Sequence, residues 1–211
     1  MPLGAWVLEE AAARAVALAA AAGRPLGMSV NVSPRQLEDA AFVATVEDVL
    51  ARTGLEPRRR VLEVTESSLV ADVDATVARL QALRDLGVRI AIDDFGTGYS
   101  SLAYLRSLPA DIIKVDRSFV EDLEGGGTAM TLVSSVVELA ASLDLVVVAE
   151  GVEQQGQAQV LTALGCGYAQ GYLYARPTAE PVVTSNALPG AGVPAQAAAP
   201  VVEQVPAVTT A

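Results

Sequence analysis

The sequence predicts an α/β fold, an incomplete (β/α) barrel of parallel strands, and three observations carry this prediction. Short β-branched runs alternate with amphipathic helical stretches, the pattern of parallel strands joined by right-handed crossovers. Polar residues recur at the carboxyl ends of these runs, where parallel α/β folds gather their functional groups. The visible chain opens with a helix, so we expect the missing strand or strands of the barrel to lie before Met1.

The predicted elements begin with a helix in Trp6–Ala22, whose apolar residues recur at helical spacing until Gly23-Arg24-Pro25 interrupts them. The predicted strands follow, the last one with the weakest signal: Met28–Val32, Val61–Thr65, Val88–Asp93, Asp111–Val115, Leu145–Ala149 and Tyr168–Leu173. The predicted helices between them are Pro34–Thr53, Asp74–Leu86, Ser100–Ser107, Thr128–Leu143 and Gln155–Leu164.

Alternation along the strands favours a barrel over an open doubly wound sheet. In Val61–Thr65, Leu62 and Val64 point to one face while Glu63 points to the other. The same parity sets a polar residue apart on four further strands: Asn31, Asp93, Lys114 and Glu150. Polar strand ends that converge on one point suit the mouth of a barrel better than the edge of an open sheet.

Composition excludes several classes of protein. The 211 residues are 52% hydrophobic but only 4% aromatic, which favours helices packed through small side chains. The chain has no histidine, which excludes Ser-His-Asp and Cys-His catalysis and histidine-ligated zinc. Cys166 is the single cysteine, so an internal disulfide is impossible, and we expect a reducing compartment and a cytoplasmic location.

Charge and hydropathy narrow the range of partners. The formal net charge of −11 disfavours nonspecific binding to DNA, RNA or an anionic membrane. No uninterrupted apolar run is long enough to cross a bilayer, so we predict no membrane span. Residues 181–211 are rich in Ala, Pro and Val and are predicted to be a disordered tail, which leaves residues 1–180 as one barrel domain.

The polar strand ends would form a cluster of four carboxylates and one amide: Asn31, Glu63, Asp93, Asp94 and Glu150. Such a cluster repels itself unless carboxylates take up protons or hard cations neutralise them, and oxygen ligands select Mg²⁺, Mn²⁺ or Ca²⁺. Asp94 joins the cluster only if the backbone turns at Phe95-Gly96. A two-metal hydrolytic site is the natural hypothesis, with Lys114 orienting a water or stabilising a phosphoryl oxygen and Gln170 completing the ring by hydrogen bonding.

Simpler explanations compete with this hypothesis for each residue taken alone. A single strand-end carboxylate is more often a solvated or capping group. Glu66 is either a surface carboxylate or a tether for the glycine-rich segment 95–101, which lacks the Gly-Lys-Ser/Thr of a nucleotide-binding loop. A solvated strand-to-helix turn explains Asp116 and Arg117 as well as a site role does, and Cys166 fits a small buried residue in a helix-to-strand turn.

Six segments of the sequence match a known family pattern: Asn31-Val32-Ser33, Leu62-Glu63-Val64-Thr65-Glu66-Ser67, Asp93-Asp94-Phe95-Gly96-Thr97-Gly98-Tyr99-Ser100-Ser101-Leu102, Lys114-Val115-Asp116, Ala149-Glu150-Gly151-Val152-Glu153 and Gln170-Gly171. Together they resemble the EAL-domain family of cyclic di-GMP phosphodiesterases, with the motif order preserved from about Pro2 to Pro177. The resemblance implies a modified TIM barrel that hydrolyses one phosphodiester bond of cyclic di-GMP to give linear pGpG, with Mg²⁺ or Mn²⁺ as cofactor and Ca²⁺ as an inhibitor.

The resemblance also implies a role for each matching residue. The metal ligands would be Asn31, Glu63, Asp93 and Asp94, with Asp93 bridging two ions. Glu150 would hold the second metal or its water, Lys114 would position the nucleophilic water, and Gln170 would help to order the site. Glu66 would anchor the Asp94–Ser101 loop, which would also contribute to a homodimer. Glu153 is a further match with a less defined role.

One departure from the family pattern concerns its defining motif. No Glu-Ala-Leu tripeptide occurs in the sequence, and by this alignment its glutamate, a metal ligand, would lie before Met1. Loss of one carboxylate would weaken metal binding and reduce the rate. Three alternatives therefore stand: a phosphodiesterase, a catalytically inactive module that binds cyclic di-GMP or a partner protein, and a nonfunctional gene remnant.

Overall fold

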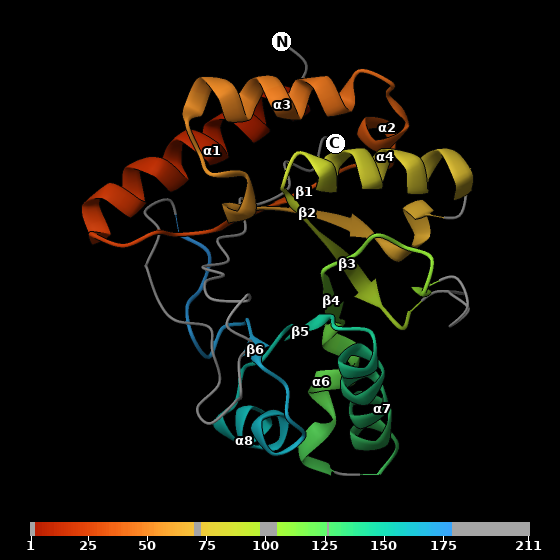
Figure 1. Cartoon of the computed structure of the whole chain (residues 1–211). Helices are drawn as coiled ribbons and strands as arrows, with labels where there is room; N and C mark the ends of the chain where they lie inside the picture. Colours follow the sequence, from red (N-terminus) through yellow and green to blue (C-terminus); the bar gives the residue numbers. More distant parts are fainter. Residues whose placement is uncertain (1–2, 70–72, 98–104, 126, 179–211) are drawn as a thin grey trace.

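Six parallel strands form one sheet that curls into a half-barrel (Figure 1). The computed structural model describes residues 3–69, 73–97, 105–125 and 127–178. The strands lie side by side in the order of the sequence: β1 (Met28–Asn31), β2 (Arg60–Thr65), β3 (Arg89–Phe95), β4 (Ile112–Val115), β5 (Val146–Ala149) and β6 (Tyr168–Ala169). The incomplete barrel predicted from the sequence is confirmed.

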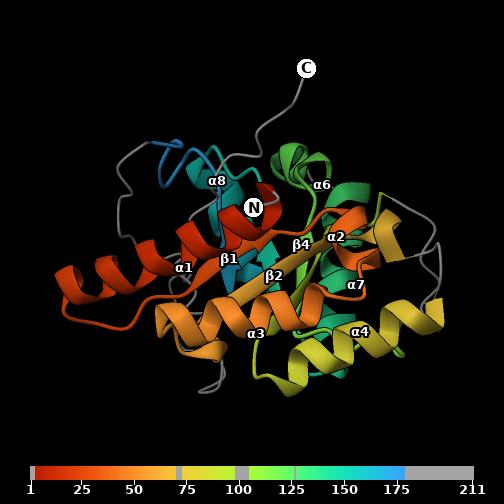
Figure 2. The same ribbon diagram turned by 90° about the horizontal axis from the view of Figure 1, so that it is seen from above.

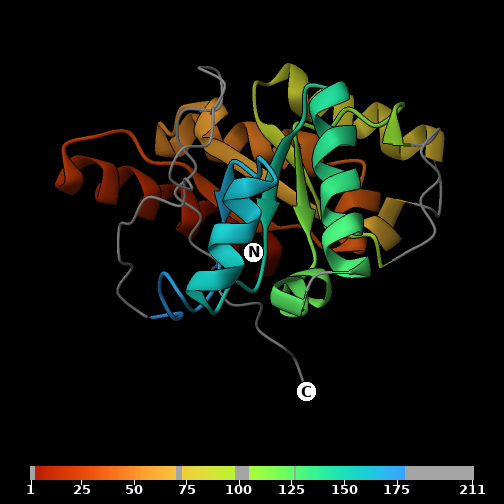
Figure 3. The same cartoon turned by 90° about the horizontal axis from the view of Figure 1, so that it is seen from below.

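Helices cover the outer face of the half-barrel. They are α1 (Leu3–Ala22), α2 (Pro34–Glu38), α3 (Phe42–Thr53), α4 (Val73–Asp85), α6 (Arg117–Glu121), α7 (Thr128–Ser142) and α8 (Gln155–Ala163), with short 3₁₀ turns η1 (Pro57–Arg59), η2 (Glu66–Leu69) and η3 (Leu123–Gly125). Helix α1 packs on β1 and α3, and α4 packs on β3 (Figure 2). Helix α7 packs on β4 and β5 at the other end of the sheet (Figure 3).

Alternate residues of each strand face two different environments. Outward-facing residues such as Leu62, Ile90 and Ile113 are fully buried in the main core beneath the helices. The inner face carries a separate apolar layer with one residue from each of β2 to β6: Val61, Ala91, Ile112, Val148 and Tyr168. The two-residue period of a strand therefore separates the helix-facing core from the barrel interior.

The single helix predicted over Pro34–Thr53 is wrong, because the chain forms two helices there. Asp39 ends α2 in an extended conformation, and its Oδ1 atom accepts a hydrogen bond from the backbone N–H of Ala41 at 2.9 Å. An aspartate that bonds to the backbone two residues ahead competes with the helical hydrogen bonds. Helix α3 then begins afresh at Phe42.

The strand predicted over Tyr168–Leu173 is also too long, since β6 ends at Ala169. Backbone pairing continues irregularly, because the N–H of Gln170 donates to Ala149 O at 2.8 Å and the N–H of Val152 donates to Gln170 O at 3.0 Å. The predicted helix Ser100–Ser107 lies mostly outside the described residues, and the predicted tail lies wholly outside them. Within the described ranges, no helix has the length and apolar character that a membrane crossing requires.

Candidate metal centre at the carboxyl ends of the strands

Lys114 on β4 lies at the centre of the polar cluster. Its side chain is 2% exposed, and its Nζ atom lies 2.7 Å from Glu63 Oε2, 3.0 Å from Asp93 Oδ1 and 2.7 Å from Glu150 Oε1. These carboxylates come from β2, from β3 and from the residue after β5. The contact with Glu63 is a hydrogen bond, and those with Asp93 and Glu150 are ion pairs.

The cluster is a second layer directly above the apolar layer of the barrel interior. Each polar residue follows an apolar one by two positions on its strand: Glu63 after Val61, Asp93 after Ala91, Lys114 after Ile112, Glu150 after Val148 and Gln170 after Tyr168. Residues two apart on a strand share a face. The parity predicted from the sequence thus places these side chains on the inner face of the half-barrel.

Burial and charge act in opposite directions on the ionisable groups of this layer. Burial lowers the pKa of Lys114, but the charges of Glu63, Glu150 and Asp93 outweigh this effect and raise its pKa above the ordinary value. Burial raises the pKa of Glu150 to about 7, with Asp93 adding to the rise and Lys114 opposing it. Lys114 is therefore a permanent cation, whereas Glu150 can hold or release a proton near neutral pH.

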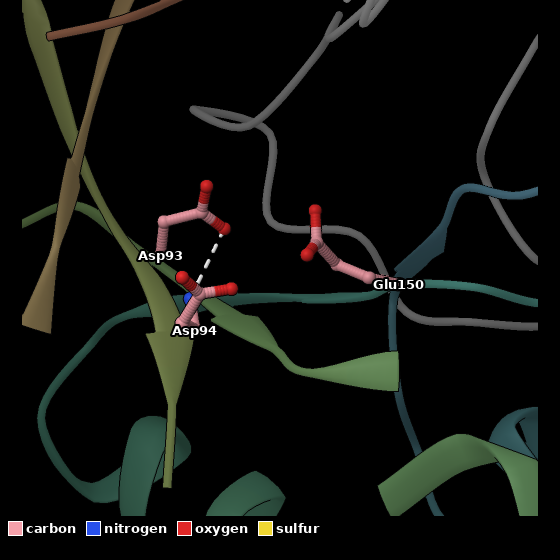
Figure 4. A group of neighbouring side chains, drawn as sticks. All are labelled: Asp93, Asp94 and Glu150. Atoms are coloured by element: carbon pink, nitrogen blue, oxygen red, sulfur yellow. Dashed lines mark hydrogen bonds between the residues drawn. The ribbon is translucent and has the colours of Figure 1, made fainter. Parts of the chain in front are cut away.

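Asp93 and Asp94 are consecutive on β3, yet both carboxylates join one group. Asp94 has a φ of 55°, and the pairing of β3 with β4 shifts register between Ile92 and Phe95. This irregularity overrides the strand alternation that would send Asp94 to the opposite face. The turn predicted at Phe95-Gly96 follows directly, since the N–H of Thr97 donates to Asp94 O at 3.3 Å and Gly96 has a φ of 98°. One oxygen each of Asp93, Asp94 and Glu150 lies within 4.8 Å of the others (Figure 4).

Electrostatic repulsion accumulates at Asp94. Partial burial raises its pKa, and the neighbouring carboxylates of Asp93 and Asp116 raise it further, while Lys114 lowers it. The backbone N–H of Asp94 donates to Asp93 Oδ1 at 3.1 Å. Lys114 makes its ion pairs with the other carboxylates of the cluster, so a further positive charge beside Asp94 would relieve this repulsion.

Gln170 adds an amide to the same layer. Its Nε2 atom donates to Glu150 Oε1, while its Oε1 atom is buried and has no hydrogen-bond partner in the described part of the chain. The chain beside Gln170 passes close to Val152, because a Cβ atom at position 171 would overlap the backbone of Val152. A glycine at this position permits that close approach. The unpaired amide oxygen is an acceptor that suits a cation or a water bound to one.

Glu66 is buried, with 3% exposure, and does not lie on the surface. It follows β2 in η2, and its Oε2 atom accepts a hydrogen bond from the backbone N–H of Gly96 at 3.0 Å. This bond connects the segment after β2 to the segment after β3, two residues beyond Asp94. This contact fits the predicted role of Glu66 as a tether for the glycine-rich segment. Residues 98–101 of that segment lie outside the described ranges.

The remaining candidate residues occupy simpler environments. Asn31 lies beside Glu63 in the strand register and is exposed at the end of β1. Asp116 caps α6 by accepting a hydrogen bond from the N–H of Ser118 at 3.0 Å. Arg117 forms exposed ion pairs with Glu121 and Glu153.

Cys166 is fully buried, and burial raises the pKa of its thiol to about 11. Its Sγ atom lies 3.2 Å from Tyr168 O, so it is the small buried residue that the sequence predicts at this turn.

Sequence reasoning missed two features of the site. The first is that Lys114 is the only lysine among the fourteen basic residues of the chain. This count could have singled out Lys114 before the structure did. Phe119 on α6 packs against Gly96, with ring atoms 2.9 and 3.0 Å from the position of a Cβ atom there. Spacing along the sequence gives no signal for the contact between Phe119 and Gly96, because only the fold brings these two segments together.

The fold and the site together define a class of protein: an α/β half-barrel whose strand ends carry a carboxylate centre suited to a hard divalent cation. The donor set is entirely oxygen, which favours Mg²⁺, Mn²⁺ or Ca²⁺ over softer metals. The family model named EAL domain matches residues 1–177. The chain belongs to the EAL-domain family.

Relatives and solved structures agree with this assignment. The cyclic di-GMP phosphodiesterase NbdA of Pseudomonas aeruginosa is 44% identical over 172 residues, which cover 82% of this chain and 22% of NbdA. A structure of PaMucR phosphodiesterase in complex with c-di-GMP superposes with a TM-score of 0.77 at 45% identity and covers 83% of this chain and 76% of that one. The chain spans only 22% and 27% of the length of two other curated relatives.

Metal complexes are known for a further neighbour. A manganese and cyclic di-GMP complex of BlrP1 from Klebsiella pneumoniae has a TM-score of 0.71 at 36% identity and covers 82% of this chain and 44% of that one. The same protein is also known as a calcium and cyclic di-GMP complex. Homologous EAL structures thus bind divalent cations together with the cyclic dinucleotide.

Proposed function

We propose that this chain hydrolyses cyclic di-GMP to linear pGpG and requires a divalent cation, Mg²⁺ or Mn²⁺. The observation that carries the proposal is the polar layer in which Glu63, Asp93 and Glu150 converge on Lys114, with Asp94 and Gln170 beside them. Relatives named as cyclic di-GMP phosphodiesterases support the substrate and the reaction.

The residues of this layer fit a cation site by their chemistry. Asp93, Asp94 and Glu150 offer carboxylate oxygens within 4.8 Å of one another, and Gln170 offers an unpaired amide oxygen nearby. Glu63 and Asn31 would supply further oxygen ligands from the neighbouring strands. A bound divalent cation would neutralise charge on the phosphodiester and lower the pKa of a coordinated water.

Lys114 would act as a hydrogen-bond donor to the reacting groups if its carboxylate partners bound a cation. In the metal-free chain its Nζ atom lies within 3.0 Å of three carboxylates. If Asp93 and Glu150 held a cation instead, an N–H of Lys114 would be free to donate to the attacking water or to a phosphoryl oxygen. The ammonium group is already fixed in the site by burial, so its orientation costs little further entropy.

The reaction requires one bond to form and one to break. A water oxygen attacks phosphorus, the bond from phosphorus to one ribose oxygen breaks, and the leaving oxygen receives a proton. Lys114 can stabilise the negative charge that develops on the phosphoryl oxygens. Glu150 would hold the cation or its coordinated water, and the proton that the attacking water loses balances the one that the leaving oxygen receives.

Incubation with cyclic di-GMP in the presence of Mn²⁺, followed by chromatography, tests the proposal. We expect pGpG to accumulate with the wild-type chain and not with Asp93→Asn, while Arg14→Met on the surface of α1 serves as a matched control. A folded chain that binds Mn²⁺ and cyclic di-GMP but releases no pGpG contradicts the proposed hydrolysis.

A second candidate is a module that binds cyclic di-GMP without hydrolysing it. The observation that favours it is that Lys114 already lies within 3.0 Å of Glu63, Asp93 and Glu150, so a resident cation balances these carboxylates without a bound metal ion. Calorimetry with cyclic di-GMP in Ca²⁺ separates the candidates: saturable binding without product supports the module, and no binding by a folded chain rejects it. A homodimer and a cytoplasmic location stay predictions.

A further inference from the structure

We infer that Phe119 is a positioning residue for Asp94 and acts through Gly96. This inference rests on the proposed function, because it assigns Phe119 a role in building the cation site. Phe119 lies on α6, directly after the strand that carries Lys114, and is half-buried against the main core. No sequence motif marked it as part of the site.

Asp94 needs external support to keep its carboxylate in the cluster. Its φ of 55° is in the left-handed region, which is strained for a residue with a Cβ atom. The turn that follows is closed locally, because the N–H and Oγ1 of Thr97 both lie within hydrogen-bond distance of Asp94 O, at 3.3 and 2.8 Å. Local bonds fix the shape of this turn but not its place relative to the neighbouring strands.

Gly96 is the point at which the turn is held from two sides. From η2, Glu66 Oε2 accepts the hydrogen bond of the Gly96 N–H at 3.0 Å. From α6, the Phe119 ring occupies the space that a side chain at position 96 would fill, with Cε2 and Cζ 2.9 and 3.0 Å from the Cβ position. The φ of 98° at Gly96 is itself a glycine conformation.

This arrangement couples the turn to the strand of Lys114. Helix α6 begins two residues after β4, so the position of its aromatic ring follows the position of that strand. Phe95 pairs with Val115 just before this point. Phe119 therefore fixes the Asp94 turn against β4, while Glu66 fixes it against β2.

Divalent-ion affinity of the whole chain tests the role of Phe119. We expect Phe119→Ala to weaken Mn²⁺ binding, measured by calorimetry, about tenfold, the lower end of what loss of a supporting residue costs a metal site. Phe119→Leu, which keeps apolar volume at the ring position, should lie between Phe119→Ala and the wild type. Val136→Ala on α7 is the matched control, since Val136 is also half-buried against the main core, and its Mn²⁺ affinity should not change.

An epistasis measurement separates positioning from general packing. In an Asp94→Asn background, Phe119→Ala should weaken Mn²⁺ binding little further, because the group that Phe119 positions is already gone. A tenfold loss that persists in that background overturns the inference, as does an unchanged affinity in folded Phe119→Ala. If Phe119→Ala does not fold, wild-type affinity in Phe119→Leu overturns it. A folded wild-type chain that binds neither Mn²⁺ nor Mg²⁺ overturns the proposed function as well.

Discussion

Replacement of Lys114 by methionine removes the one cation that the polar layer supplies to three carboxylates. The side chain is 2% exposed and its three contacts are 3.0 Å or shorter. Loss of one partner from a buried ion pair costs about 3–5 kcal/mol, because the other partner stays buried without compensation. For a domain of this size we expect a fall in Tm of about 6–20 °C.

Calorimetric melting of the metal-free chain measures this effect. Arg14→Met is the control, since the pair of Arg14 with Glu10 is exposed at 49% and 42% and spans one helical turn, and such a pair contributes about 0.5 kcal/mol or less. Mn²⁺ should raise the Tm of Lys114→Met more than that of the wild type, because a cation then replaces the missing ammonium. A Lys114→Met chain that melts like Arg14→Met shows that Lys114 does not stabilise the carboxylates, and one that gains nothing extra from Mn²⁺ shows that no cation replaces the ammonium group.

Three further predictions concern other members of the site. Burial raises the pKa of Glu150 from 4.5 to about 7 in the folded chain. The free energy of unfolding of the metal-free chain should therefore fall as the pH rises from 4.5 to about 7, and Glu150→Gln should remove this pH dependence in urea titrations. Asp94→Asn relieves the repulsion that raises the pKa of this carboxyl and should raise the metal-free Tm while weakening Mn²⁺ binding at least about tenfold by calorimetry. Gly171→Ala, whose Cβ atom would overlap Val152, should cost about 1–3 kcal/mol in urea unfolding, whereas Gly167→Ala, with open space at its Cβ position, should be nearly neutral.

Each of these predictions has an outcome that contradicts it. A pH slope that survives in Glu150→Gln shows that another group titrates. An Asp94→Asn chain with wild-type Mn²⁺ affinity removes Asp94 from the site. Equal stabilities for the Gly171 and Gly167 variants mean that the close approach to Val152 is not constraining.

Strand parity is the part of the site that the sequence predicts well. A strand has a strict period of two, so alternation along the chain is enough to assign Glu63, Lys114 and Glu150 to the inner face. Their apolar neighbours two positions earlier form the layer beneath them. Regular alternation, repeated on successive strands, thus predicts both the half-barrel and the composition of its polar layer.

Departures from regular geometry could not be predicted in the same way. The left-handed conformation of Asp94 and the register shift beside it precede a residue, Gly96, that contacts Glu66 and Phe119, both of which are distant in sequence. The break after α2 depends on a side-chain hydrogen bond of Asp39. Local propensity gave no sign of either feature, because competing local conformations differ by little free energy until tertiary contacts select one.

Lysine-selective ¹³C labelling tests whether the carboxylates around Lys114 bind a divalent cation. Lys114 is the only lysine, so its Cε group gives a single side-chain lysine signal. We predict that this signal shifts saturably when Mg²⁺ is added, and again when cyclic di-GMP follows, because carboxylates leave the ammonium group for the cation. A signal from the folded chain that stays fixed at millimolar Mg²⁺ would contradict this prediction.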